Sequence, residues 1–269
     1  MKNGCLNKQI DPFELKIRLP KISITEDNLW NAFSIFNPNE YHPSLEKQIR
    51  SCAYRYAAIL THGKATIGEI QKQLKKGFTV DFTMINQELP TKQDFFLEFN
   101  YPNILSNLEA FLIATKSLLD VLSTLLTHKI GKKITGFHRK GPKDKPIYGG
   151  RVLNALKNTK ESKFPHRDKL ISIIEHHKKL WIDNLIAMRD QIVHGGELKD
   201  FINFWTVIRA GRKKPYSDVD VFPPLLKNEG EVKQYCEKIL KFIEEFIKDF
   251  LNITFPPKER RIFLAAHKK

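Results

Sequence analysis

The sequence predicts a mainly α-helical fold, a helical bundle with an N-terminal helical extension and a small β-hairpin inserted before the last helix. Two observations predict it. Long segments carry apolar residues three or four positions apart, the spacing of one helix face, and a single late segment alternates as a strand pair does. No period of about 20 to 50 residues repeats, which excludes a solenoid. Hydrophobic residues make up 41% of the 269 positions, enough for an ordered core.

Residues 1–100 are predicted to form the N-terminal extension. Residues 1–40 favour extended segments with a short helix near 26–35, and 78–100 alternate loosely before becoming irregular. The clearest helix of this part spans 43–76, where Ser44 is a plausible N-cap. Gly63 predicts a bend or break inside that helix. Its apolar face is predicted to contain Ile49, Cys52, Tyr56, Ile59 and Leu60.

The bundle is predicted to span residues 101–253, followed by a basic tail at 254–269. Its helices are expected at about 104–126, 151–156, 167–193 and 231–251, and the pair Gly195-Gly196 is expected to end the third. Residues 202–222 predict the hairpin, because Phe204, Thr206 and Ile208 alternate ahead of a basic turn.

Charge points to a polyanionic partner. Lys and Arg number 45 against 30 Asp and Glu, which gives a formal charge of +15. Such an excess repels itself in the folded state and is usually retained for a partner such as nucleic acid. No apolar stretch reaching about 18 residues is apparent, so no membrane partner is expected. Three scattered cysteines and a polar N-terminus predict reduced thiols and a cytoplasmic location.

One short motif closes the predicted helix at 167–193. Arg189 and His194 are separated by four residues, and Asp190 follows the Arg directly. With the surrounding helix order, this stretch resembles the HEPN family, small all-helical bundles whose signature is Arg, four to six residues, then His. The resemblance covers about 101–253. Many HEPN proteins are metal-independent ribonucleases of toxin–antitoxin pairs, CRISPR effectors and phage-defence systems. It implies an endoribonuclease, with an antitoxin or defence-system protein as a possible partner.

The spacing alone is a weak signal, because Arg55 with His62, and Arg260 or Arg261 with His267, also satisfy it. Only Arg189 and His194 end a long amphipathic helix. Five positions on an ideal helix rotate a side chain by about 140°, so the two residues share a face only if the helix ends at His194. The simpler alternative is that Arg189 pairs with a neighbouring carboxylate and His194 only caps the helix.

The motif predicts acid–base cleavage of RNA. The 2′-hydroxyl is an internal nucleophile, an imidazole moves its proton, and a guanidinium neutralises the charge on the phosphoryl oxygens. The resemblance implies a 2′,3′-cyclic phosphate product and a homodimer in which two motifs share one cleft. We expect neither metal nor cofactor. Asp190 is a further candidate catalytic residue. Asp120 interrupts an apolar run and is expected either to orient Arg189 or His194 or to face solvent.

A basic segment completes the candidate RNA interface. Residues 129–169 hold thirteen Lys or Arg against three acids, with Phe137, His138, Tyr148 and His166 interleaved as possible stacking groups. The predicted RNA-binding residues are Lys129, Lys132, Lys133, Arg139, Lys140, Lys143, Lys145, Arg209, Arg212, Lys213 and Lys214. The alternative function, from a different class, is a non-catalytic HEPN-like module that binds RNA or a protein.

Overall fold

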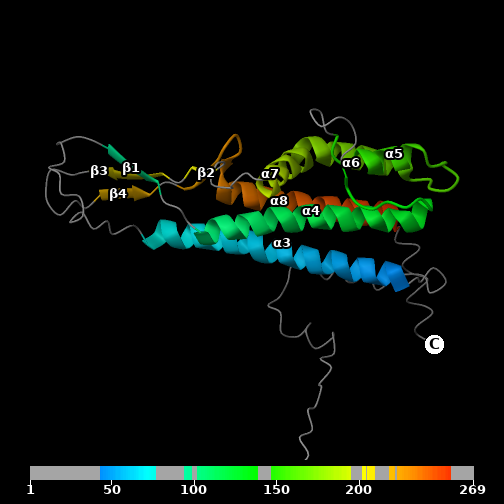
Figure 1. The fold of residues 1–269 in the computed structure, drawn as a ribbon, viewed down its shortest axis with the longest axis horizontal. Helices are drawn as coiled ribbons and strands as arrows, with labels where there is room; N and C mark the ends of the chain where they lie inside the picture. Colours follow the sequence, from blue (N-terminus) through cyan, green and yellow to red (C-terminus); the bar gives the residue numbers. More distant parts are fainter. Residues whose placement is uncertain are drawn as a thin grey trace, which may run out of the picture.

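Two long antiparallel helices, α3 (Pro43–Lys76) and α4 (Pro102–Ile130), run along the length of the molecule (Figure 1). The structure is a computed structural model and describes residues 43–76, 94–98, 102–138, 147–194, 202–203, 205–209, 218–221 and 223–255. The short helix expected near 26–35 and the tail from 256 lie outside these ranges. The predicted mainly helical fold is confirmed.

α3 is one continuous helix, so the bend or break expected at Gly63 is wrong. A Cβ at Gly63 would lie 3.1 Å from Cε2 of Phe111 and 3.3 Å from Cδ1 of Leu240. The glycine therefore serves the close approach of α3 to α4 and α8 rather than a turn. Tyr56 and Ile59 of α3 belong to the same apolar core as the other helices.

The remaining helices surround α4. They are α5 (Gly150–Lys157), α6 (Arg167–His177), α7 (Asp183–Val193) and α8 (Val232–Thr254), with the π-helical turn η3 (Lys178–Ile182) joining α6 to α7. α4 contacts α3 and α7, and α8 contacts α3 and α6. α4 and α8 thus lie between α3 and the α5–α7 segment (Figure 1).

The predicted helix at 167–193 is present, but η3 interrupts its regular winding. A π-turn hydrogen bond joins residues five apart, and here the Asp183 N–H donates to the Lys178 carbonyl. The wider turn also brings the Lys178 ammonium within 2.7 Å of the Asp183 carboxylate. Lys178, which is buried, donates to the Tyr148 carbonyl as well, and so fixes the segment that precedes α5.

Short strands lie at one end of the bundle (Figure 1). The predicted hairpin is confirmed as β3 (Trp205–Arg209) and β4 (Asp218–Val221), paired antiparallel with Thr206 opposite Val221. β1 (Asp94–Glu98) adds a strand beside β3, within a segment that we expected to be irregular. A second sheet joins β2 (Ile202–Asn203), β5 (Leu225–Leu226) and β6 (Gly230–Glu231).

α4 corrects one further expectation. By length and composition it is apolar enough to cross a membrane, although we expected no stretch of that kind. Half of its apolar window is buried against other parts of the chain, and Lys116 and Asp120 form an ion pair within it. Its packing is that of the central helix of the bundle.

Candidate active site

α7 ends at Val193 and places the motif at its C-terminus. His194 is the C-cap, with φ −98° and ψ 20°, and its N–H donates to the Asp190 carbonyl at 3.0 Å. The helix therefore ends at the position that the spacing of the motif requires. The His194 side chain is exposed, as an imidazole that meets substrate has to be. Gly195 and Gly196, the expected helix stop, lie outside the described residues.

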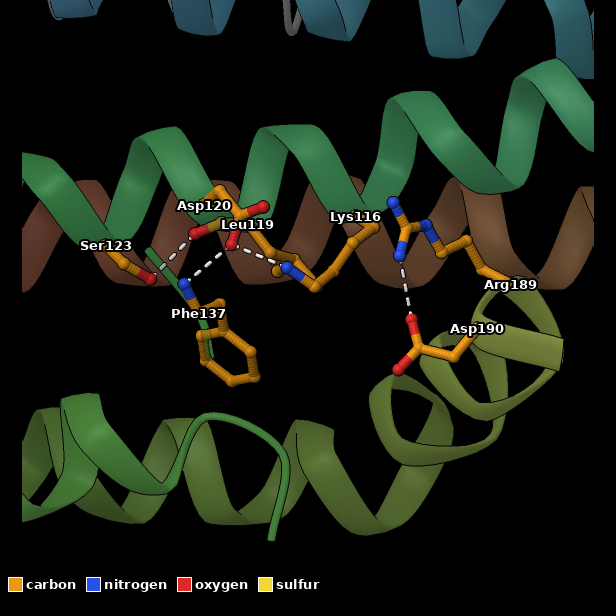
Figure 2. A network of polar contacts seen from close by, with 7 residues as sticks. All are labelled: Lys116, Leu119, Asp120, Ser123, Phe137, Arg189 and Asp190. Atoms are coloured by element: carbon orange, nitrogen blue, oxygen red, sulfur yellow. Dashed lines mark hydrogen bonds and ion pairs between the residues drawn. The ribbon is translucent and has the colours of Figure 1, made fainter. Parts of the chain in front are cut away.

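Arg189 leaves α7 in the direction of α4 (Figure 2). Its Nη1 donates to the Asp190 carboxylate at 2.8 Å, and the two side chains are 27% and 25% exposed. This is the neighbouring carboxylate of the simpler alternative. The buried Nε has no hydrogen-bond partner among the described residues. A guanidinium has five N–H donors, so donors remain for an anion. A partly exposed ion pair also stabilises by only about 1 kcal/mol, so a phosphate can compete with Asp190.

Asp120 does not hydrogen-bond to Arg189 or His194 in the described part of the chain, which corrects the expected orienting contact. Its Oδ1 accepts from the Lys116 ammonium at 2.6 Å and from the Phe137 N–H at 2.7 Å (Figure 2). Thr127, about two turns further along α4, accepts from the Ile134 N–H at 3.0 Å. The two side chains fasten the loop 131–138 to α4.

Lys116 was missed by the sequence reasoning. It is 9% exposed, an unusual position for an ammonium, and lies beside Arg189 in Figure 2. A signal was available, because Lys116 precedes Asp120 by four residues inside an apolar helical run, and that spacing forms helical ion pairs. The structure thus places two separate ion pairs, Lys116–Asp120 on α4 and Arg189–Asp190 on α7, on two helices that contact each other (Figure 2).

The predicted RNA-binding lysines differ in how they are held. Lys129 lies over the Phe255 ring at 5.0 Å, and Lys132 donates to the Asn158 carbonyl at 3.0 Å. Lys133 is exposed on the loop 131–138. Arg209 ends β3, and its side chain is not described. Outside the described residues lie Arg139, Lys140, Lys143, Lys145, Arg212, Lys213 and Lys214.

Two of the four interleaved rings point inward. Phe137 is 2% exposed, and its Cζ lies 2.2 Å from where a Cβ on Gly149 would be, so the ring fills the space that the glycine leaves. Tyr148 is half-buried against the core. Stacking on RNA bases therefore remains a prediction only for His138 and His166, which are both exposed.

The competing Arg55–His62 pair lies within the continuous helix α3. The His62 ring nitrogen is 3.1 Å from the Asn107 amide oxygen, a contact that joins α3 to α4. His62 therefore has a structural contact in the middle of a helix, unlike His194. Arg260, Arg261 and His267 lie outside the described residues.

Within the described ranges, no group of three or more His, Cys, Asp or Glu side chains is placed to hold a metal ion. Comparison with protein-family models, curated proteins and solved structures finds no match to this chain. The HEPN resemblance therefore rests on the motif, its position at a helix end and the order of the helices.

Proposed function

We propose that this protein is a metal-independent endoribonuclease of HEPN type, acting as a toxin or phage-defence effector. One observation carries the proposal: Arg189 and His194 stand at the C-terminal end of α7, the guanidinium directed to α4 and the imidazole exposed at the cap. The charge of +15 supports an RNA substrate, because phosphate contacts dominate nucleic-acid affinity.

In the proposed reaction His194 removes the proton from the 2′-hydroxyl, and the 2′-oxygen attacks the adjacent phosphorus. Arg189 neutralises the charge that develops on the phosphoryl oxygens, exchanging Asp190 for the substrate. The bond from phosphorus to the 5′-oxygen breaks, which leaves a 2′,3′-cyclic phosphate and a 5′-hydroxyl. The leaving 5′-oxygen needs a proton, so the site needs a second group, one that acts as an acid. The resemblance supports an isologous homodimer in which a second copy brings its own motif to the same cleft.

Cleavage of single-stranded RNA in the presence of EDTA is the decisive test. We expect the wild-type protein to cut, and Arg189→Ala and His194→Ala each to lower the rate by at least about 100-fold, the usual contribution of an acid–base or oxyanion group. His62→Ala is the matched control, because His62 belongs to a competing Arg–His pair. Unaltered melting temperatures confirm that the variants fold. Full cleavage by both motif variants contradicts the proposal.

The Arg189–Asp190 ion pair favours a second candidate, a module that binds RNA without cutting it. If Asp190 holds Arg189 permanently, the guanidinium serves structure and the motif is inert. A wild-type protein that binds RNA with a steep salt dependence but leaves it intact in both EDTA and Mg²⁺ supports this candidate instead.

A further inference from the structure

His138 stands next to Asp120 at the end of the loop 131–138. The two groups meet over Gly136: a Cβ at that glycine would lie 2.8 Å from Oδ1 of Asp120 and 2.9 Å from Nε2 of His138. Gly136 has φ +155°, so backbone and space together require a residue without a side chain. Because Gly136 has no side chain, the His138 imidazole can lie close to the Asp120 carboxylate.

The carboxylate is held firmly on its other side. Asp120 Oδ1 accepts from the buried Lys116 ammonium and from the Phe137 N–H. Phe137 is itself fixed by its packing on Gly149. The Asp120 side chain remains 31% exposed, and His138 is exposed beside it. This arrangement places the His138 imidazole close to a firmly held carboxylate and leaves the residue exposed to solvent or substrate.

Asp120, which lies close to His138, belongs to α4, the helix towards which the Arg189 side chain is directed (Figure 2). Asp120 lies four residues, about 6 Å along α4, from Lys116, and Figure 2 shows the Arg189 side chain directed to α4. α4 and α7 are in direct contact. The charged groups on this surface are Lys116 and Asp120 from α4, with Arg189 and Asp190 from α7.

We propose that His138 is a further catalytic residue of the RNA-cleaving site and that Asp120 is its positioning residue. The inference rests on the proposed function and assigns the proton donor of that site to His138 rather than to the partner's His194. His194 takes the proton from the 2′-hydroxyl as the bond from the 2′-oxygen to phosphorus forms. His138 gives its proton to the 5′-oxygen as the bond from phosphorus to that oxygen breaks. Exchange of both protons with water restores the two imidazoles.

The test compares kcat and KM for RNA cleavage by full-length His138→Ala protein with those of the wild type. General acid catalysis is worth about 100-fold or more, so we expect kcat to fall by about that factor while KM stays within about twofold. Added free imidazole restores the rate, because it supplies the missing proton donor. His176→Ala is the matched control, since His176 is an exposed imidazole on α6 outside the predicted RNA-binding residues, and it is expected to cut at the wild-type rate without added imidazole.

Asp120→Asn tests the positioning role, because the amide oxygen still accepts from the Phe137 N–H and keeps the loop in place. We expect a smaller fall in kcat and an unchanged KM, with a lower melting temperature because the buried Lys116 ammonium loses its carboxylate partner. His138→Ala protein that cuts at the wild-type rate, or that changes KM alone, overturns the inference. If His194→Ala is inactive at the same time, the proposed function stands without His138. If Arg189→Ala and His194→Ala both cut normally, the proposed function fails first.

Discussion

His177 is a buried histidine that gives folding a pH dependence of its own. The residue is 4% exposed, its ring lies 5.1 Å from that of Phe246, and its Nδ1 accepts from the Trp181 indole N–H at 2.9 Å. Burial lowers the pKa of His177 below the ordinary value of 6.5, and the neighbouring His176 lowers it further. Asp249 and Glu245 oppose the shift. The folded protein therefore holds His177 in its neutral form.

The sign of the effect follows from linkage. The unfolded chain takes up a proton on His177 near pH 6.5, whereas the folded chain takes it up only at lower pH. Folding stability from this group is complete above that value and decreases as the pH falls towards the lowered pKa. His177→Gln keeps an acceptor for Trp181 but does not titrate. Between about pH 7.5 and about pH 5 we therefore expect its melting temperature to fall less than that of the wild type. His166→Gln, at an exposed histidine that takes no part in the pKa shift of His177, is the control. Equal losses in the wild type and His177→Gln contradict the assignment.

At the residue scale, local patterns predicted the candidate motif, whereas its contacts needed three dimensions. The end of α7 at His194 was predicted from the following Gly195-Gly196 and agrees with the spacing of the motif. The partner of Asp120 could not be predicted in this way, because the Phe137 N–H reaches it across seventeen positions through a loop. A buried lysine such as Lys116 reads as surface in a sequence, since composition does not reveal which face of a helix lies inside a bundle.

At the element scale, α3 offers two glycines with opposite surroundings. At Gly63 an added side chain meets Phe111 and Leu240, whereas at Gly68 it meets nothing within 4 Å. We expect Gly63→Leu to lower the free energy of unfolding by roughly 1–3 kcal/mol through overpacking. Gly68→Leu is expected to leave stability unchanged or raise it by up to about 1 kcal/mol, because leucine favours a helix. Urea unfolding of both variants measures the difference, and equal stability excludes the tight contact of α3 with α4 and α8.

Elements that form from local sequence patterns could be predicted, whereas elements that form through contacts distant in the sequence could not. Helix faces repeat locally, so the sequence predicted the five α-helices from α4 onwards and the hairpin β3–β4. It did not predict η3, which divides one expected helix into α6 and α7. β1 was not, because its run Asp94-Phe95-Phe96-Leu97-Glu98 lacks alternation and its partner β3 is distant in the sequence. Gly63 misled for a related reason: a glycine that breaks a helix and one that admits a neighbouring helix look the same in a sequence.

At the scale of the whole molecule, the charge of +15 predicts salt-dependent RNA binding. Each lysine that contacts a phosphate adds about one unit to the slope of log affinity against log salt. We expect Lys133→Ala, at an exposed position of the loop 131–138, to weaken binding for all RNA sequences and to reduce that slope by about one. Lys72→Ala, a 57%-exposed lysine of α3, is the matched control and is expected to change neither quantity. Equal slopes for both variants and the wild type indicate that the loop is only a solvated surface.

The proposed dimer is a property of the whole molecule, because it places two motifs at one cleft. A two-fold axis beside the C-terminal end of α7 brings a second Arg189 and a second His194 to the substrate. The mass in solution should then be twice that of one 31.3 kDa chain at the concentrations where cleavage is measured. Activity per chain should fall on dilution as the dimer dissociates.

Mixing inactive variants tests the shared cleft directly. Arg189→Ala and His194→Ala homodimers each lack one kind of group, whereas a heterodimer retains one Arg189 and one His194 from opposite chains. Because these two face the same phosphate in a shared cleft, we expect the mixture to cut RNA after subunit exchange, at a fraction of the wild-type rate. Mixing Arg189→Ala with an Arg189→Ala/His194→Ala double variant is the control, since no such heterodimer has an intact Arg189. A mixture as inactive as its parents, or a monomer that cuts at the full rate, would instead place each complete site within one chain.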